Sequence, residues 1–419
     1  MSTATTTPTV ATPERAESPL IAYAKNYGRK LRGGDLGALP AVAGLVFLCA
    51  LFTILNPAFL APLNIANLFT QAAPITVIAM GLVFVLLLGE IDLSAGFTSG
   101  VCAAVLAILL TNEGWPWYAA CGIAIVTGAA IGVLLGFLVA KVGIPSFVVT
   151  LAAFLAFQGV VLRLLKEGTN ISIRDNQTVI IALENEYLSP MLGWAFVAIA
   201  VLGLAAVQIV TKLKRMNRGL ASDPWEIVAL RIGSLAVLLG VAVAVLNEER
   251  SRNPAIFGSL KGLPIIVPII TVLLVFWTIV LRRTRFGRHV YAVGGNMEAA
   301  RRAGIRVDTI RIAAFVICSS MAAIGGIVAV SQARSVDPNT GGSNVLLYAV
   351  GAAVIGGTSL FGGRGRILDA ILGGLVVAVI VNGLGLLGLS SWVKYVFTGS
   401  VLLAAAGVDA LFRRRSATS

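Results

Sequence analysis

The sequence is poor in charge: charged residues make up 12% of its 419 residues, against about a quarter in soluble globular proteins. It has one histidine, His289, which cannot build a metal site or a Ser/His/Asp triad by itself. The four cysteines lie in apolar runs without Cys-x-x-Cys spacing, which favours small buried residues over redox or metal roles. Soluble and metal-dependent classes are therefore disfavoured.

Motifs for energy conversion are absent as well. There is no Gly-Lys dipeptide and hence no Walker A loop, and no arginine ladder marks a voltage sensor. If ATP drives this protein, a separate subunit must hydrolyse it. The start of the chain has no apolar segment after basic residues, so we expect a polar tail rather than a cleaved signal peptide. Its basic part, Tyr23–Arg32, is expected to lie on the anionic inner leaflet.

What the sequence has in abundance is apolar runs. Hydrophobic residues make up 58% of the chain, and its mean hydropathy is +0.92. Many runs approach the roughly 20 residues that a helix needs to cross a bilayer. We predict an all-α, polytopic membrane bundle of 10 to 12 helices, with candidate spans at 41–59, 71–89, 93–110, 116–140, 145–165, 190–210, 229–246, 263–281, 311–330, 345–361, 367–388 and 393–411. The short pair within 71–110 could also be a broken or re-entrant element.

The basic residues predict the orientation of these spans. With the N-terminus inside, 24 of the 32 Lys and Arg residues fall in inside segments, which places both termini in the cytoplasm. The net charge of +13 then reflects topology rather than nucleic-acid binding, because the cations flank apolar spans. We expect a disordered basic tail at 1–38, a membrane domain at 39–412 with a cytoplasmic loop at 282–311, and a second tail at 413–419.

The loop at Leu281–Arg311 holds eight arginines between two apolar runs. Its middle, Gly294–Gly304, reads as a loop followed by a short helix that Asn296 caps and Gly304 ends. A short capped helix held by two spans is suited to contact something in the cytoplasm. The chain therefore looks like one part of a larger machine.

Two carboxylates, Glu90 and Asp92, follow an unbroken apolar run. A carboxylate deep in a bilayer costs about 2.5–3.5 kcal/mol, so such groups are usually paired, at an interface, or beside a water-filled path. Either this segment lines a solute route, or it is a tight turn in which Asp92 caps the next helix. The segment also aligns with 356–363 at three positions, which hints at a parallel repeat.

Polar side chains within the spans are few and neutral, as a hydroxyl-rich solute would require. Gln158 and Asn382 are the stronger candidates because they are large and lie in mid-span, although interhelical hydrogen bonds of about 0.6 kcal/mol are the usual role of such groups. Gly128, Gly132 and Gly136 form a double G-x-x-x-G stripe, which predicts a helix-packing face.

Four stretches together resemble a known family: GEIDLSAG at 89–96, IPSFVVTLAAFLAFQGVVL at 144–162, FGRHVYAVGGNMEAARRAGI at 286–305 and AVIGGTSLFGGRG at 353–365. The chain is similar to the permease subunits of bacterial ABC sugar importers of the ribose/xylose/galactose group. The added region at about 212–261 and the E-I-D-L-S motif resemble the xylose-type permeases most.

The resemblance implies a transport subunit, not an enzyme, in the bacterial cytoplasmic membrane. Its partners would be a cytoplasmic ABC ATPase, an extracytoplasmic sugar-binding protein, a second permease copy, a monosaccharide and membrane lipid, without nucleic acid, cofactor or metal. The ATPase contacts would be Gly294, Gly295, Asn296, Glu298, Ala299, Ala300, Arg301, Arg302 and Gly304. The translocation path would draw on Glu90, Asp92, Ser94, Gln158, Thr358, Ser359 and Asn382.

Three other classes remain open from the residues. An ion-coupled transporter needs an ionisable group deep in the bundle, and Glu90 and Asp92 alone qualify. A membrane enzyme needs clustered acids or histidines at one depth, which are not apparent. A branched-chain amino acid permease would favour a mid-span cation or helix N-terminus for the carboxylate, and no mid-span Lys or Arg is apparent.

Overall fold

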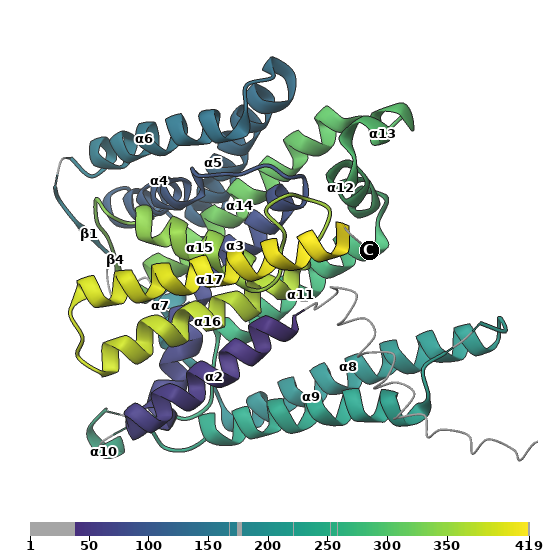
Figure 1. Ribbon diagram of the computed structural model, residues 1–419. Helices are drawn as coiled ribbons and strands as arrows, with labels where there is room; N and C mark the ends of the chain where they lie inside the picture. Colours follow the sequence, from purple (N-terminus) through teal and green to yellow (C-terminus); the bar gives the residue numbers. More distant parts are fainter. Residues whose placement is uncertain are drawn as a thin grey trace, which may run out of the picture.

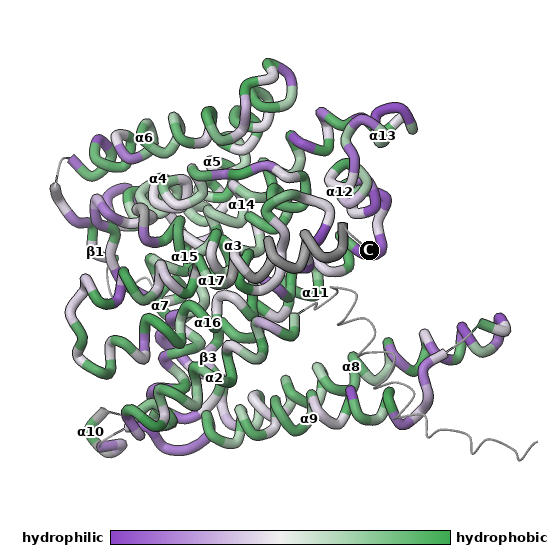
Figure 2. The backbone as a smooth tube through the Cα atoms, in the orientation of Figure 1, coloured by the Kyte–Doolittle hydropathy of each residue, from purple (hydrophilic) through white to green (hydrophobic). Residues whose placement is uncertain are grey.

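The computed structural model describes residues 38–166, 168–173, 178–220, 222–251, 253–257 and 259–417, and the tail predicted at 1–38 lies almost wholly outside them. The described chain is a bundle of helices, as predicted (Figure 1). Nine of its helices are long and apolar enough to cross a membrane, and α2 and α15 are shorter apolar helices. Figure 2 shows apolar residues along most of each long helix.

Each predicted span corresponds to a helix. In chain order the first half consists of α2 (Leu39–Leu55), η1 (Pro57–Leu60), α3 (Pro62–Leu87), α4 (Ala95–Ala107) with η2 (Ile108–Asn112), α5 (Trp117–Phe137) with η3 (Leu138–Val142), α6 (Ser146–Leu164), α7 (Thr178–Asn185) and α8 (Pro190–Met216). The second half consists of α9 (Trp225–Leu246), α10 (Pro254–Phe257), α11 (Ile266–Arg283), α12 (Arg285–Gly295), α13 (Met297–Arg302), α14 (Val307–Ala333), α15 (Ser343–Ile355), α16 (Ile367–Leu386) and α17 (Ser391–Ala417).

Burial separates a core from a periphery. Helices α3, α4, α14 and α16 are mostly enclosed, and 83% of the apolar window of α3 is buried. By contrast, α8 and α11 are each only 11% buried over the same length, so their apolar side chains are left for lipid or another chain. In Figure 1 the α8–α9 hairpin lies along one edge of the bundle and α6 along the opposite edge.

Short strands and the α12–α13 segment mark opposite ends of the bundle (Figure 1). Strand β1 (Ile171–Ser172) pairs antiparallel with β4 (Ser335–Val336), and β2 (Tyr187–Leu188) pairs antiparallel with β3 (Leu263–Pro264). The start of α2 and the end of α17 lie at the same end as α13. Both termini and the loop at 282–311 were predicted to lie on one side of the membrane, and the start of α2, the end of α17 and α13 do share one end of the bundle. The side of the membrane that this end faces stays a prediction.

The predicted glycine stripe packs α5 against α14. A methyl group on Gly128 would lie 2.6 Å from the Ser319 carbonyl oxygen, and one on Gly136 would lie 2.8 Å from the Ile312 Cα. Such close approach of two backbones is possible only where the side chain is absent. The stripe is therefore a helix-packing face, as expected.

The first boundary of α3 differs from the prediction. The helix begins at Pro62 rather than near 71, and it continues through Pro74. Pro62 occupies the first turn, where the missing N–H costs nothing. Helix α3 and the α4–η2 pair both count as candidate spans, so the 71–110 region has the dimensions of two separate spans.

Candidate coupling site

The α12–α13 segment begins with a capped helix that the sequence analysis did not anticipate. Thr284 is the N-cap of α12, and its Oγ1 accepts a hydrogen bond of 3.2 Å from the Gly287 backbone N–H. Val290 and Val293 face the core, while the arginines of this helix lie on its outer side. The amphipathic pattern holds α12 against the bundle and carries the chain to α13.

The short helix α13 forms as predicted. The Asn296 side chain accepts a hydrogen bond of 2.9 Å from the Ala299 N–H, and Gly304 follows the helix with a φ of +82°. That backbone conformation is one that glycine adopts at no steric cost. Glu298 lies 3.5 Å from both Arg301 and Arg302, and these three side chains are 57–80% exposed. The end of α13 thus presents a charged, accessible surface.

The residues predicted as ATPase contacts divide into two groups. Exposed residues are Gly295, Asn296, Glu298, Ala299, Arg301, Arg302 and Gly304, whereas Ala300 is buried in the main core and Gly294 is half-buried. A methyl group on Gly294 would overlap the Leu87 carbonyl oxygen and lie 2.9 Å from the Gly363 nitrogen. Gly294 and Ala300 therefore face the bundle, because the chain passes directly over α3 here.

Three segments far apart in the sequence meet beneath α13: the end of α12, the end of α3, and the loop before α16. The Gly363 N–H donates to the Leu87 carbonyl oxygen over 2.9 Å, and the Tyr291 hydroxyl donates to the Gly365 carbonyl oxygen over 2.7 Å. Backbone contacts of this kind leave little freedom for relative motion.

The segment between α3 and α4 is a tight, enclosed turn. Asp92 is fully buried, and its Oδ1 accepts hydrogen bonds from the Ser94 N–H over 2.9 Å and the Ser94 hydroxyl over 2.6 Å. Burial raises the pKa of this carboxyl group. Thr150 of α6 donates to the Ile91 carbonyl oxygen over 3.2 Å. The turn is tight and enclosed, as one of the two alternatives expected, but the N-cap of α4 is Ser94 and not Asp92.

Glu90, in the same turn, forms an ion pair with Arg311 of α14. The Arg311 and Glu90 side chains are only 15% and 11% exposed, so this pair is largely shielded from water. Arg311 lies one turn into the helix that follows α13. The turn is thereby connected to the coupling segment by charge as well as by packing.

Thr358 and Ser359 belong to the loop that joins α15 to α16, and both are buried. Thr358 lies 3.4 Å from Asp369, whose carboxylate also accepts hydrogen bonds from the Arg366 side chain and backbone. Gly89 and Phe361, from the two segments that align in the sequence, lie against each other. The structure thus places Glu90, Asp92, Ser94, Thr358 and Ser359 at one end of the bundle, in closed hydrogen-bonded turns.

Asn382 lies elsewhere, in a cluster of amides among the helices. It exchanges two hydrogen bonds of 2.9 Å with Asn64 of α3, and it donates to Gln71 over 3.2 Å. Asn64 was missed because the predicted span began after it. Gln158 is half-buried on α6 and does not join this cluster. The predicted path residues therefore occupy three separate places.

Within the described residues, no three His, Cys, Asp or Glu side chains gather closely enough to hold a metal ion. The polar contacts described above are hydrogen bonds and ion pairs. Some of these hydrogen bonds join α3, α12 and the loop before α16 beneath an exposed charged helix.

Comparison with known proteins identifies the family of the chain. Residues 64–406 match the family described as "Branched-chain amino acid transport system / permease component". The chain is 33% identical to the xylose transport system permease protein of Escherichia coli strain K12, over 92% of this chain and 95% of the relative. It is 32% identical to that of Haemophilus influenzae, over 91% and 98%. It is 31% identical to the ribose import permease protein of Bacillus subtilis, over 92% and 95%. No solved structure matches the chain.

The fold is that of a multi-pass helical protein of the cell membrane, and the matched family is one of transport-system permease components. The chain belongs to the family of transport-system permease components named above. The family description mentions amino acids, whereas these relatives are named for xylose and ribose.

Proposed function

We propose that this chain is the membrane-spanning subunit of an ATP-driven ABC importer for a monosaccharide, D-xylose or a similar sugar. The observation that carries the proposal is its likeness to permeases named for xylose and ribose, at 31–33% identity over more than nine-tenths of the chain. A cytoplasmic ATPase subunit, an extracytoplasmic sugar-binding protein and a second permease copy would complete the importer.

Helix α13 is the proposed contact with the ATPase. Its exposed residues, Asn296, Glu298, Arg301 and Arg302, offer both signs of charge on one short, rigid element. ATP would act by binding one conformation of the whole assembly more tightly than the other. The junction at Leu87, Gly294 and Gly363 would pass the resulting displacement to the core helix α3 and to the loop before α16.

The test of this role exchanges charges on α13. In reconstituted vesicles containing both partners, we expect the double change Glu298→Arg and Arg301→Glu to abolish ATP-dependent xylose uptake while membrane insertion is unchanged. The matched control exchanges another exposed ion pair, Asp223 with Arg231, whose two side chains are each 43% exposed on the α8–α9 hairpin. Full uptake and ATPase recruitment by the α13 variant would contradict the proposal, as would uptake driven by an ion gradient without ATP.

The translocation path is a second part of the proposal. Neutral amides can exchange hydrogen bonds with sugar hydroxyl groups, and the Asn64, Gln71 and Asn382 cluster brings three of them together. Glu90, Asp92, Ser94, Thr358 and Ser359 would act at the α13 end by connecting helices rather than as solute contacts, since they are enclosed. Gln158, on the exposed helix α6, would approach the solute only if a second copy covers that helix.

Asn382→Leu tests the amide cluster. The change leaves the Asn64 side-chain oxygen without its donor, so the double variant Asn64→Leu and Asn382→Leu serves as the control for that structural effect. We expect both variants to lose uptake, although the double variant regains part of the stability that the single change loses. Normal transport kinetics in the double variant would remove the cluster from the path.

A further inference from the structure

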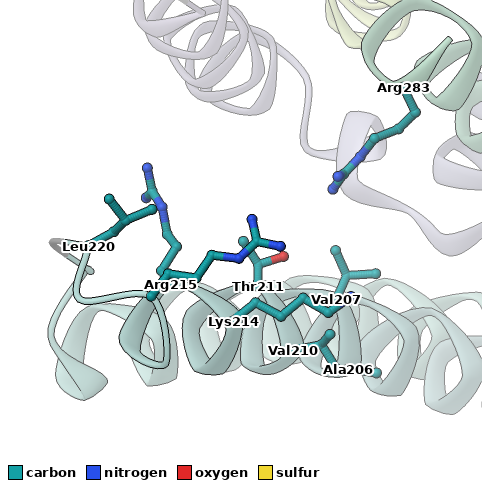
Figure 3. Close-up of a pocket in the computed structure, with 9 residues that line it drawn as sticks. Ala206, Val207, Val210, Thr211, Lys214, Arg215, Leu220 and Arg283 are labelled. Atoms are coloured by element: carbon teal, nitrogen blue, oxygen red, sulfur yellow. The ribbon is translucent and has the colours of Figure 1, made fainter.

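A basic groove lies between the end of α8 and the end of α11. Lys214 and Arg215 line one side, and Arg283 reaches toward them from α11 (Figure 3). Arg218 also lines the groove. The groove has a volume of about 460 Å³. It lies at the same end of the bundle as α12 and α13 (Figure 1).

The four cations of this groove have no acidic partner in the described part of the chain. None of them takes part in the ion pairs found there, and no Asp or Glu lines the groove. Arg231, farther along on α9, shows the contrast because it is paired with Asp223. Four positive charges around one space repel one another, and an anion bound among them would offset that repulsion.

The wall of the groove is apolar below the cations. Val207 and Val210 of α8 line it, and the apolar surface of α8 continues beyond it through residues such as Leu202, which is 67% exposed. On α11, exposed side chains such as Ile279 likewise precede Arg283. The groove therefore lies at the boundary where exposed apolar helix surface gives way to a cluster of cations. A small free anion would use only the polar half of such a site.

We propose that this groove binds an anionic phospholipid. The phosphate would accept charge-assisted hydrogen bonds from guanidinium groups on both walls, and the acyl chains would lie along the exposed apolar side of α8. Arg283 directly precedes Thr284, the N-cap of α12. The bound lipid would therefore connect the peripheral α8–α9 hairpin to the start of the α12–α13 segment.

The probe is phosphatidylglycerol, compared with phosphatidylcholine of the same acyl chains, added to the delipidated full-length chain and measured by native mass spectrometry. The test variant is Arg215→Gln with Arg283→Gln, which removes one cation from each wall. The matched control is Arg163→Gln with Lys394→Gln, which removes two cations at the opposite end of the bundle. The thermal midpoint of each variant in detergent verifies that it is folded, and Arg215→Lys with Arg283→Lys replaces the test variant if it is not.

We expect the wild type and the control to retain phosphatidylglycerol preferentially. Each basic side chain near an anionic lipid contributes roughly fivefold to binding, so the test variant should bind about 25-fold more weakly. The lysine variant keeps both charges but loses the planar donor pairs, so it should fall between them. An excess of inorganic phosphate should leave the lipid bound.

Three results would overturn the proposal. The first is equal retention of both lipids by the wild type. The second is an equal loss of binding in the test and control variants. The third is displacement of the lipid by inorganic phosphate alone, which would make the groove a simple anion site.

Discussion

At the level of single residues, the Glu90–Arg311 ion pair is a shielded contact that joins the turn before α4 to α14. Each side chain is mostly shielded from water, and the Arg311 Nε is buried without a partner among the described residues. Removing one member of such a pair leaves the other charged and desolvated. The pair therefore has more effect on stability than an ion pair on the surface.

We expect Glu90→Gln to lower the free energy of unfolding in detergent by about 3–5 kcal/mol, since Arg311 would keep its charge in a buried site. Lys141→Gln is the matched comparison, because Lys141 pairs with Asp308 at the start of the same helix but with side chains 55% and 34% exposed. That surface pair should contribute about 0–1 kcal/mol. Denaturant titration followed by tryptophan fluorescence measures both, and equal losses would contradict the assignment.

Glu184, in α7, gives a prediction about pH. It is 4% exposed, and burial raises its pKa from 4.5 to about 9. Between these two values the folded chain keeps a proton that the unfolded chain releases. The contribution of the protonated Glu184 carboxyl group to the free energy of unfolding is therefore complete below about pH 4.5. It is lost as the pH rises toward 9, by at most about 1.4 kcal/mol per pH unit.

Glu184→Gln should remove this dependence. The variant should match the wild type at low pH and should be the more stable of the two as the pH approaches 9, because its amide carries no charge to bury. Thermal midpoints measured from pH 5 to pH 9.5 test this expectation. Parallel curves for the two proteins across that range would show that Glu184 does not titrate during unfolding.

At the level of elements, the contact between α5 and α14 depends on missing side chains. A methyl group on Gly132 would lie 2.5 Å from the Val316 Cα, whereas one on Gly122, in the same helix, would meet nothing within 4 Å. The two glycines have the same helix propensity, so their difference is one of packing alone. They form a matched pair of sites.

Gly132→Ala should push α5 away from α14 and destabilise the chain by about 1–3 kcal/mol. Gly122→Ala should be neutral or stabilising by up to about 1 kcal/mol, because alanine is the better helix former. Thermal unfolding of the two variants in the same detergent separates them. If both changes proved neutral, the close approach of the two helices would be in doubt.

The helices themselves could be predicted from the sequence because apolar length alone determines them. Each expected span has a helix, and the Asn296 cap and the Gly304 end were evident from residue types. Two elements were misjudged for local reasons. The start of α3 was placed too late because Asn64 and Asn67 interrupt its apolar run, and α12 was not anticipated because its outer face is rich in arginine.

The contacts that build the junction could not be predicted in the same way. Glu90 and Arg311 are 221 positions apart, and Asn64 and Asn382 are 318 apart, so no local pattern relates the members of either pair. Glu90 was selected for its unusual place beside an apolar run, but its partner depends on how α14 packs. Gly294 was assigned to a partner protein, and its contact with α3 appears only once the chain is folded.

At the scale of the whole molecule, the proposed mechanism depends on which side of the membrane α13 faces. Helix α13 and the loop between α9 and β3 lie at opposite ends of the bundle (Figure 1). The distribution of basic residues in the sequence predicts that the α13 end lies in the cytoplasm. Single cysteines at the two ends would decide this point.

Arg302→Cys places a thiol on α13, where the native side chain is 80% exposed, and Lys261→Cys places one at the other end, where it is 45% exposed. In intact cells a membrane-impermeant maleimide should label Lys261→Cys at once, and should label Arg302→Cys only after permeabilisation. The four native cysteines are buried or half-buried, so the unsubstituted chain measures the background. Labelling of Arg302→Cys in intact cells would place α13 outside, where no cytoplasmic ATPase could reach it.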